Sequence, residues 1–326
     1  MKNLAYIYQH NGIDNGHSIF DKRLTGALVK VYGDKFYAIE YNRQTNSLIG
    51  DANKQAIDND STIIVLSHCN TFKIAGWFKK SKVIFINHDL PYYAYFLQKN
   101  LPGLAKALYA WFYIHYYWRL ASFIFFISVS EKGKSGIAAN KCAHIRVGVK
   151  PGGNILNFKT IQPVAVFTGN YRWSLKSKAL QKAFTKPYTG TLQLAAINVD
   201  DIFRKTVTAT NANVVYWDEM QNPAGIKLGV ITDDFLSGFK LKALELIHSG
   251  CCLVSFSDIT AEFEGIIHAP LFIRTIKSLN ELDAVYNELL ADANILNKFN
   301  LFYNDVCDKF NWDKTTIAIS NMLANF

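Results

Sequence analysis

The segment IKLGVITDDFLSGFKLKALELIHSGCCLVS, from Ile226 to Ser255, decides the fold class of this chain. Its first residues form an apolar run that is typical of a buried strand, and Gly238 marks a turn. The residues after that turn carry apolar side chains at three- and four-residue spacing, which predicts a helix that ends at Gly250. A second apolar run follows. A strand, a helix and a strand in this order predict part of a parallel sheet covered by helices.

The same alternation occurs in two series along the chain. The first series contains predicted strands at Leu4–Tyr8, Phe36–Glu40, Thr62–Leu66, Val83–Asn87 and Ile124–Val129. The second contains predicted strands at Val164–Thr168, Gln193–Ile197, Val214–Trp217, Leu228–Thr232, Leu253–Phe256 and Pro270–Ile273. Buried strands that alternate with helices predict an α/β fold, here with two Rossmann-like parallel-sheet domains that face a central cleft.

A break between the two series predicts the domain boundary. Residues 151–153 are a proline followed by two glycines, which interrupt regular structure and permit a hinge. The 326 residues suit two domains of about 150 residues each. We expect an N-terminal domain at 1–155, a C-terminal domain at 156–310, and a final helix at 311–326 that packs back on the N-terminal domain.

Composition narrows the classes of protein and of partner. The chain is 50% hydrophobic and 19% charged, which is typical of a globular protein. Its net charge of +9 favours anionic partners such as nucleotides, phospholipid headgroups or nucleic acid. Because the basic residues are scattered rather than grouped in a block, we expect no nucleic-acid binding. The five cysteines lack metal-site and redox spacing, and no signal peptide is present, so we expect a cytoplasmic protein.

One predicted helix, Leu104–Leu120, is unusually rich in aromatic residues. Lys106, His115 and Arg119 interrupt its apolar character, so it lacks the run of about 20 apolar residues that spans a bilayer. Tyrosine and tryptophan favour the boundary between membrane and water, which would suit peripheral contact with the inner face of the membrane. The alternative is a well-filled core or interdomain helix.

Several residues around Gly238 suit a nucleotide. The turn at Ser237 and Gly238 places backbone N–H groups and the positive end of a helix dipole where a phosphate can bind. Lys240 and Lys242 add positive charge, and Glu245 is placed to accept hydrogen bonds from ribose hydroxyls. Each feature also has a simpler explanation, because such turns are common and charged residues usually face solvent.

This segment resembles the donor-site region of GT-B glycosyltransferases, in particular the large retaining family of bacterial polysaccharide and lipid glycosyltransferases. That family carries two glutamates eight positions apart, and Glu245 matches the second, which implies a role in holding the ribose. Ser237 stands where the family has its first glutamate, near the transferred sugar, so sugar identity and stereochemistry stay open. The resemblance also implies donor contacts for Gly238 and Phe239, and Lys240 or Lys242 resembles a lysine found in this turn of divergent relatives.

The segment from Val166 to Lys178 is similar to the family's first strand, loop and helix of the donor domain. The resemblance implies that Arg172 and either Lys176 or Lys178 stabilise the negative charge on the leaving nucleoside diphosphate. A solvated basic loop is the alternative.

In the N-terminal domain, the loop with Gly12, Gly16 and His17 resembles the flexible loop that faces the diphosphate and the acceptor in this fold. His88 and Asp89 follow a predicted strand, at an edge where α/β sheets bind ligands. Family members often carry a histidine or an aspartate there. Either residue would orient a sugar hydroxyl, or Asp89 would act as general base in an inverting enzyme. An ordinary strand-to-turn signal is the alternative.

The sequence therefore predicts a glycosyltransferase that moves a sugar from a nucleoside diphosphate sugar to a glycan or lipid-linked acceptor, in bacterial-type surface polysaccharide synthesis. We expect no cofactor, and no metal because the chain lacks a supported Asp-x-Asp arrangement. Two alternatives stay open: a sugar-nucleotide epimerase or hydrolase on the same fold, and a non-catalytic sugar-nucleotide-binding or partner subunit.

Overall fold

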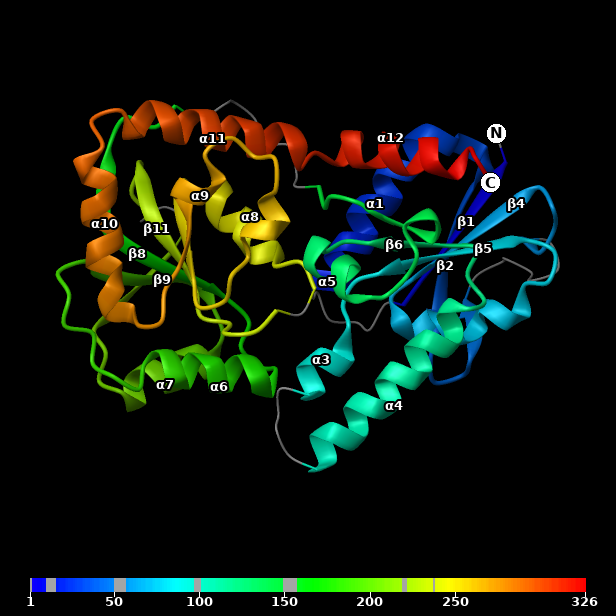
Figure 1. Ribbon diagram of the computed structural model, residues 1–326, viewed down its shortest axis with the longest axis horizontal. Helices are drawn as coiled ribbons and strands as arrows, with labels where there is room; N and C mark the ends of the chain where they lie inside the picture. The colour runs from blue at the N-terminus through cyan, green and yellow to red at the C-terminus, as the bar shows by residue number, and fades with distance from the viewer. Residues whose placement is uncertain are drawn as a thin grey trace. The chain divides into compact units, whose positions relative to one another are not determined.

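Two β-sheets organise the protein, in a computed structural model that describes residues 2–9, 16–49, 57–96, 101–148, 157–218, 222–236 and 238–326 (Figure 1). The chain divides into two compact units. The first unit comprises Met1–Lys150, Ser237–Phe239 and Phe310–Phe326, and the second comprises Pro151–Leu236 and Lys240–Lys309. The boundary predicted between residues 155 and 156 lies outside the described residues.

The sheet of the first unit has seven strands in the order β3-β2-β1-β4-β5-β6-β7. All neighbouring pairs are parallel except β2 and β3. Every residue of β4 is buried, as expected for a parallel strand covered on both faces. The strands are β1 (Asn3–Tyr8), β2 (Phe36–Asn42), β3 (Ser47–Ile49), β4 (Thr62–Ser67), β5 (Lys82–Asn87), β6 (Phe123–Phe126) and β7 (Cys142–His144).

The helices of the first unit connect these strands or follow from the end of the chain. The α-helices are α1 (Gly16–Tyr32), α3 (Pro91–Phe96), α4 (Leu101–Trp118), α5 (Val129–Lys134) and α12 (Trp312–Leu323), and the 3-10 helices are η1 (Gly33–Lys35), η2 (Cys69–Trp77) and η3 (Ala139–Lys141). No helix in the described ranges is long and apolar enough to cross a membrane.

The sheet of the second unit has six strands in the order β10-β9-β8-β11-β12-β13, and all its neighbouring pairs are parallel. The strands are β8 (Ile161–Gly169), β9 (Gln193–Val199), β10 (Val214–Trp217), β11 (Ile226–Ile231), β12 (Cys251–Ser255) and β13 (Ile273–Thr275). The helices are α6 (Ser174–Ala183), α7 (Asp201–Ala209), α8 (Leu241–His248), α9 (Ala269–Phe272), α10 (Leu282–Ala291), α11 (Ile295–Lys309), and the 3-10 helices η4 (Thr260–Phe263) and η5 (Leu279–Glu281).

The strand order of the second sheet reverses direction between β8 and β11. Crossovers between parallel strands are right-handed, so connections that run in opposite directions from this point place their helices on opposite faces. Figure 1 shows α6 and α7 on one side of this sheet and α8 and α11 on the other. Sheets of this architecture bind ligands at the point of reversal, beside the carboxyl ends of the two strands. Here these strands are β8 and β11.

Two predicted strands differ from the structure. Residues 270–273 were expected to be a strand, but Pro270 lies in the first turn of α9, where proline is favoured, and the strand begins only at Ile273. The strand predicted to end at Val129 ends at Phe126 instead. Ser128 then caps α5, because its side chain accepts a hydrogen bond from the backbone N–H of Glu131.

The last helix, α12, packs on α1 of the first unit. The ring of Trp312 meets that of Phe20 edge to face, with centroids 5.4 Å apart. The Thr315 hydroxyl donates to the carbonyl of Arg146 across 2.8 Å. A side chain at Gly148 would overlap Trp312, so glycine is needed where the chain passes this helix.

Candidate functional site

A buried aspartate surrounded by lysines follows β11 in the second unit. The carboxylate of Asp233 is inaccessible to solvent. The Nζ of Lys242 lies 2.8 Å from its Oδ1, and the Nζ of Lys240 lies 3.2 Å from its Oδ2. Burial by itself would raise the pKa of Asp233, but the positive charges of Lys242, Lys240 and Lys176 hold it well below its usual range. Asp233 is therefore ionised at neutral pH.

Lys176 brings a third positive charge from α6. Burial and, to a smaller extent, the positive charges of Lys242 and Lys240 lower its pKa to about 8, while Asp233 opposes the shift. Below that pH Lys176 keeps its proton. Three positive charges then face one negative charge, so this cluster of Lys176, Asp233, Lys240 and Lys242, here called the lysine cluster, carries a net charge of +2. A buried excess of positive charge favours an anionic ligand.

Two aromatic rings make cation–π contacts with the lysine cluster. The Nζ of Lys240 lies 4.6 Å from the centre of the Phe235 ring, and that of Lys242 lies 5.5 Å from the centre of the Tyr171 ring. Both rings are buried, so these contacts stabilise the ammonium groups where water is scarce. Asp200 fixes the backbone of Tyr171 by accepting its N–H across 2.7 Å.

The lysine cluster lies at the topological switch point of the second sheet. Lys176 comes from α6, which follows β8, whereas Asp233, Lys240 and Lys242 follow β11. These two strands are neighbours at the position where the winding reverses. Lys240 also immediately precedes α8, whose first turn adds the positive end of a helix dipole.

The structure separates the other predicted donor residues. Arg172 and Lys178 are exposed, and Glu245 is exposed on α8. Phe239 is buried, and its ring centroid lies 5.7 Å from that of Phe310 in the first unit. Ser237 lies outside the described residues. The helix expected to start at the Ser237 turn begins instead at Leu241.

Gly238 belongs to the first unit and lies against two predicted catalytic residues. Its N–H donates to Oε1 of Glu131 across 2.7 Å, and the same oxygen accepts the N–H of Leu90 across 2.9 Å. Gly238 has a φ of +63°, and a Cβ there would lie 2.7 Å from the carbonyl oxygen of His88. Glycine is therefore required on both conformational and steric grounds. Its N–H group, expected to face a phosphate, is engaged by Glu131.

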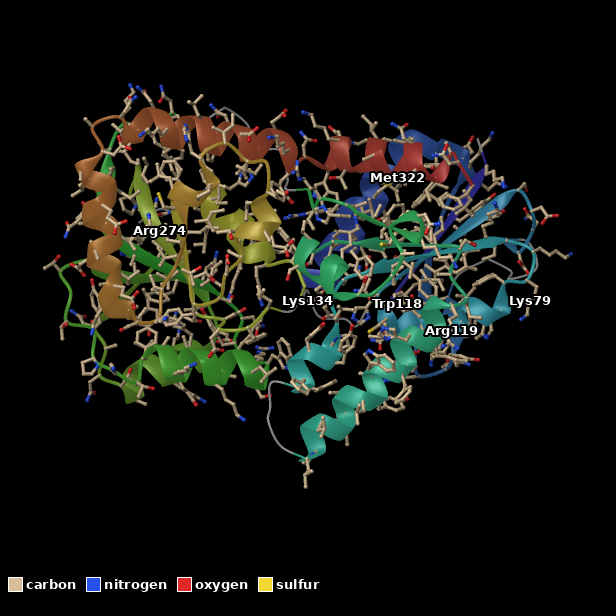
Figure 2. All side chains as sticks on the ribbon, viewed as in Figure 1. Lys79, Trp118, Arg119, Lys134, Arg274 and Met322 are labelled. Carbon is tan, nitrogen blue, oxygen red and sulfur yellow. The ribbon has the colours of Figure 1, made fainter. Side chains whose placement is uncertain are left out.

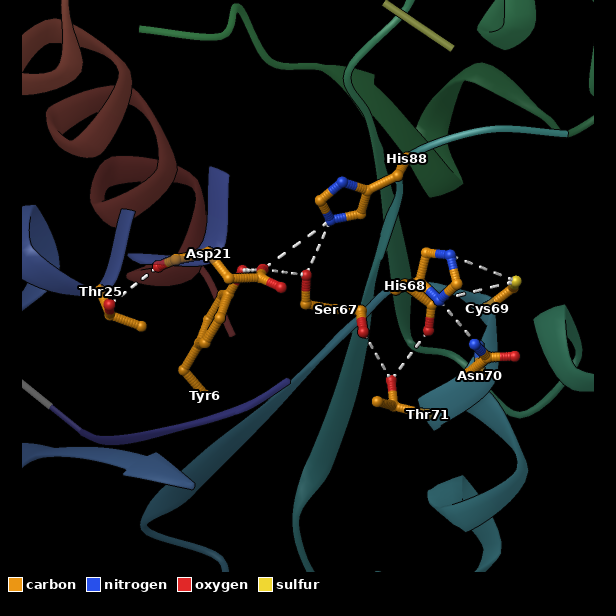
Figure 3. A network of polar contacts seen from close by, with 9 residues as sticks. All are labelled: Tyr6, Asp21, Thr25, Ser67, His68, Cys69, Asn70, Thr71 and His88. Atoms are coloured by element: carbon orange, nitrogen blue, oxygen red, sulfur yellow. Dashed lines mark hydrogen bonds and ion pairs between the residues drawn. The ribbon is translucent and has the colours of Figure 1, made fainter. Parts of the chain in front are cut away.

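His88 belongs to a buried polar network at the switch point of the first sheet (Figure 3). Its Nε2 lies 2.8 Å from Oγ of Ser67, and that hydroxyl donates to Oδ1 of Asp21 across 2.5 Å. Tyr6 also donates to Oδ1 of Asp21, across 2.6 Å. Since Ser67 gives its proton to Asp21, it can only accept from His88, which places the imidazole proton on Nε2.

Burial dominates the protonation of this network. It raises the pKa of Asp21 to about 7, although the hydrogen bonds from Ser67 and Tyr6 oppose the shift. The aspartate therefore titrates near neutral pH. The ring of His88 also packs edge to face against Phe20, with centroids 4.5 Å apart, so its orientation is fixed by both packing and hydrogen bonding.

The remaining predicted residues of the first unit have different surroundings. Asp89 is half-buried and lies near His68 and Cys69, and the three offer metal-ligand atoms within 4.8 Å of one another. Gly12 lies outside the described residues. Gly16 begins α1. The backbone of His17 lies in α1, but its side chain lies outside the described part of the chain.

Comparisons with known proteins find similarity in structure but not in sequence. No protein-family model and no curated protein sequence matches the chain. HepE from Anabaena, in complex with UDP-glucose, superposes with a TM-score of 0.63 at 13% identity over 100% of both chains. Sucrose-phosphate synthase from Thermosynechococcus elongatus gives 0.67 at 12% identity over 100% of this chain and 99% of its own. These solved structures are of the GT-B type.

The chain has the GT-B fold. A third structure, the lipopolysaccharide outer core galactosyltransferase WaaB in its apo form, agrees, with a TM-score of 0.62 at 12% identity over 99% of this chain and 100% of its own. In this GT-B protein the lysine cluster belongs to the second Rossmann-like domain and the His88 network to the first.

Sequence reasoning overlooked several residues of this GT-B protein. No role was predicted for Asp233, because a pair of aspartates in a loop usually faces solvent. Only its burial reveals that it organises the lysines. Asp21 and Ser67 were missed because α1 and β4 are far apart in sequence, and no local pattern links them to His88.

Proposed function

We propose that this chain is a glycosyltransferase that takes a sugar from a nucleoside diphosphate sugar. The observation that carries the proposal is the lysine cluster, which holds a net charge of +2 at the switch point of the second sheet. A diphosphate is the anionic group that this arrangement suits best, since three ammonium groups can bind several of its oxygens at once.

The lysine cluster also suits the chemistry of glycosyl transfer. When the bond between the sugar and the diphosphate breaks, negative charge grows on the leaving phosphate oxygens. Positive groups that are already in place stabilise that charge most in the transition state. Asp233 holds Lys240 and Lys242 in place through ion pairs of 3.2 and 2.8 Å despite their burial. We propose that these lysines supply the charge that a divalent metal supplies in other transferases.

Among nucleotides, UDP is the first to test. HepE, one of the structures that this chain resembles, was solved with UDP and with UDP-glucose. Glu245 and Arg172, both exposed, stay our candidates for the ribose and the phosphates, and Lys178, Gly238 and Phe239 for further donor contacts.

His88 and Asp89 are our candidates on the reacting side. His88, which the Ser67 network holds in a fixed orientation, is our candidate to orient a sugar hydroxyl. Asp89 is half-buried and next to it, and would act as general base in an inverting enzyme. The stereochemistry of the product decides whether the pair orients a sugar hydroxyl or Asp89 acts as general base.

We further propose that α4 brings the enzyme to an anionic membrane surface, where a glycan or lipid-linked acceptor of surface polysaccharide synthesis is found. Residues 90–130 contain no aspartate or glutamate. The outer stripe of α4, at four-residue spacing, is exposed although apolar: Leu104 42%, Leu108 52%, Phe112 64% and Tyr116 61%. A helix that is apolar on its outer face needs a partner there.

A cavity of about 550 Å³ beside α4 supports this membrane proposal. Trp111, Phe112 and Tyr116 contribute its aromatic wall, and Arg119 and Lys141 add positive charge. Figure 2 shows Trp118 and Arg119 together at the end of this helix. Aromatic side chains next to cations match the boundary between lipid tails and anionic headgroups.

A donor screen tests the proposed activity. Thermal unfolding is followed with UDP, GDP, ADP and CDP, because a ligand that binds only the folded state raises its melting temperature. If one of these nucleoside diphosphates binds, sugar nucleotides that carry the same base are then incubated with the protein and lipid extracts. The release of nucleoside diphosphate is measured. Release that depends on acceptor supports transfer. Binding without any release would point to a non-catalytic subunit, and release without acceptor to a hydrolase.

A further inference from the structure

A second cluster of reactive side chains lies in the first unit, at the carboxyl ends of β4 and β5. His68 and Cys69 follow β4, and Asp89 follows β5. The imidazole, thiol and carboxylate each offer one ligand atom, and these atoms lie within 4.8 Å of one another. All three residues are half-buried. They therefore meet at a place that is only partly shielded from solvent.

The backbone at His68 explains how two successive residues reach the same place. In an extended strand, neighbouring side chains point to opposite faces. His68 instead has a φ of +72° and a ψ of 145°, a conformation that costs a non-glycine residue about 1–3 kcal/mol. As a result the Sγ of Cys69 lies 3.9 Å from both ring nitrogens of His68 (Figure 3). Strain of this kind is concentrated at functional positions.

We infer that His68, Cys69 and Asp89 form a binding site for a divalent transition metal ion of the zinc class. A thiolate and an imidazole select such ions over magnesium or calcium, which prefer oxygen ligands. The carboxylate of Asp89 completes a set of three protein ligands, and where it binds an ion it does not take the general-base role proposed above. Three protein ligands leave the fourth tetrahedral position for water or a substrate atom. These three residues belong to the first unit, whereas the lysine cluster belongs to the second.

The spacing of the sulfur and the imidazole nitrogens is close to what an ion requires. With metal–ligand bonds of about 2.0–2.3 Å, tetrahedral ligand atoms lie roughly 3.5 Å apart. The sulfur-to-nitrogen distances of 3.9 Å are already close to this value. The Nδ1 of His68 accepts a long hydrogen bond of 3.3 Å from the N–H of Asn70, so coordination through Nδ1 exchanges a weak contact for a metal bond.

The test uses the full chain, stripped of metal by chelation and then titrated with Co²⁺. A cobalt–thiolate bond gives a charge-transfer absorption band that imidazole and carboxylate ligands do not give. We expect the band to saturate at one ion per chain and to disappear in Cys69→Ser. Cys307→Ser is the matched control, because Cys307 is also a half-buried free thiol but lies in the second unit, and it should keep the band.

Zn²⁺ affinity, measured by competition with a chromophoric chelator, gives a second readout that does not depend on Cys69. We expect at least a tenfold loss of affinity in His68→Gln and in Asp89→Asn, with circular dichroism spectra like that of the unaltered chain. A Co²⁺ titration without the thiolate band would overturn the inference. So would Zn²⁺ affinities that are equal in the unaltered chain and in these two variants.

Discussion

Lys242 donates a hydrogen bond from its Nζ to Oδ1 of Asp233 across 2.8 Å, and the carboxylate that accepts it has no contact with solvent. A buried ion pair is costly to form, because both groups lose their water, and it is costly to break once formed. Lys240 and Lys176 add charge that Asp233 cannot neutralise. Folding therefore holds a surplus of positive charge in place, which is useful to a protein that binds an anion.

Removal of the negative charge at the centre of the lysine cluster should destabilise the fold. Asp233→Asn keeps the shape of the side chain but removes the negative charge that pairs with the buried Lys240 and Lys242. We expect the free energy of unfolding in urea to fall by about 3 kcal/mol. Asp234→Asn is the matched control, since Asp234 pairs with Lys182 at the surface across 2.7 Å, and it should cost less than about 1 kcal/mol. Equal losses in the two variants would contradict the assigned role of Asp233.

Replacement of Gly238 by alanine should lower the free energy of unfolding more than the same replacement at Gly136, which has a similar backbone conformation. Gly238→Ala would place a Cβ 2.7 Å from the carbonyl oxygen of His88, at a φ of +63°. Gly136 has a φ of +70° and open space around it, so Gly136→Ala measures the conformational cost alone, about 1–2 kcal/mol. We expect urea denaturation to give at least about 1 kcal/mol more for Gly238→Ala. No difference would mean that this turn does not pack tightly against His88.

The raised pKa of Asp21 predicts a pH-dependent stability. An aspartate titrates near 3.9 when unfolded, and burial raises this pKa to about 7 in the folded protein. Between these values the folded state binds more protons than the unfolded state, so stability falls as pH rises from about 4 to 7. In Asp21→Asn this contribution, of the order of 4 kcal/mol at most, is absent. Urea denaturation of both proteins across this range checks the slope, and parallel profiles would show that Asp21 ionises normally.

Much of the fold could be predicted from the sequence, because the periodicity of apolar residues is a local property. The last helix, Trp312–Leu323, lies within its predicted range of 311–326, and nine of the eleven predicted strands overlap observed strands over most of their length. The short strands β3 and β7 were missed, since three residues carry too little pattern. Helix α9 was mistaken for a strand because its four apolar residues are too few to distinguish the two periods.

The candidate site was less predictable than the fold. The sequence indicated lysines near Gly238, but it could not choose between Lys176 and Lys178. The two lysines lie on different faces of α6. The charge of Lys176 acts on Asp233, whereas Lys178 is exposed. The contact of Gly238 with Glu131 joins residues 107 positions apart, and no local pattern predicts such a pairing.

The exposed stripe of α4 should bind anionic vesicles. We expect the protein to float with vesicles that contain phosphatidylglycerol, and less with pure phosphatidylcholine. Phe112→Ser combined with Tyr116→Ser removes two exposed rings and should weaken binding at least about tenfold. Ile317→Ser changes an exposed apolar residue on α12 of the same unit, so it is the control and should bind as the unaltered chain does. Equal flotation of the double variant and the control would exclude α4 as the docking surface.

The affinity for UDP, measured by calorimetry at pH 7, tests the central claim most directly. At this pH Lys176, with a pKa of about 8, still carries its proton. Lys176→Gln removes one positive charge from the lysine cluster and leaves both ion pairs of Asp233 in place, whereas Lys178→Gln removes an exposed charge from the same helix. We predict that Lys176→Gln binds UDP about tenfold more weakly than the unaltered chain and that Lys178→Gln changes the affinity less than about threefold. Equal affinities for UDP in all three proteins, or no binding of any nucleoside diphosphate, would contradict the account.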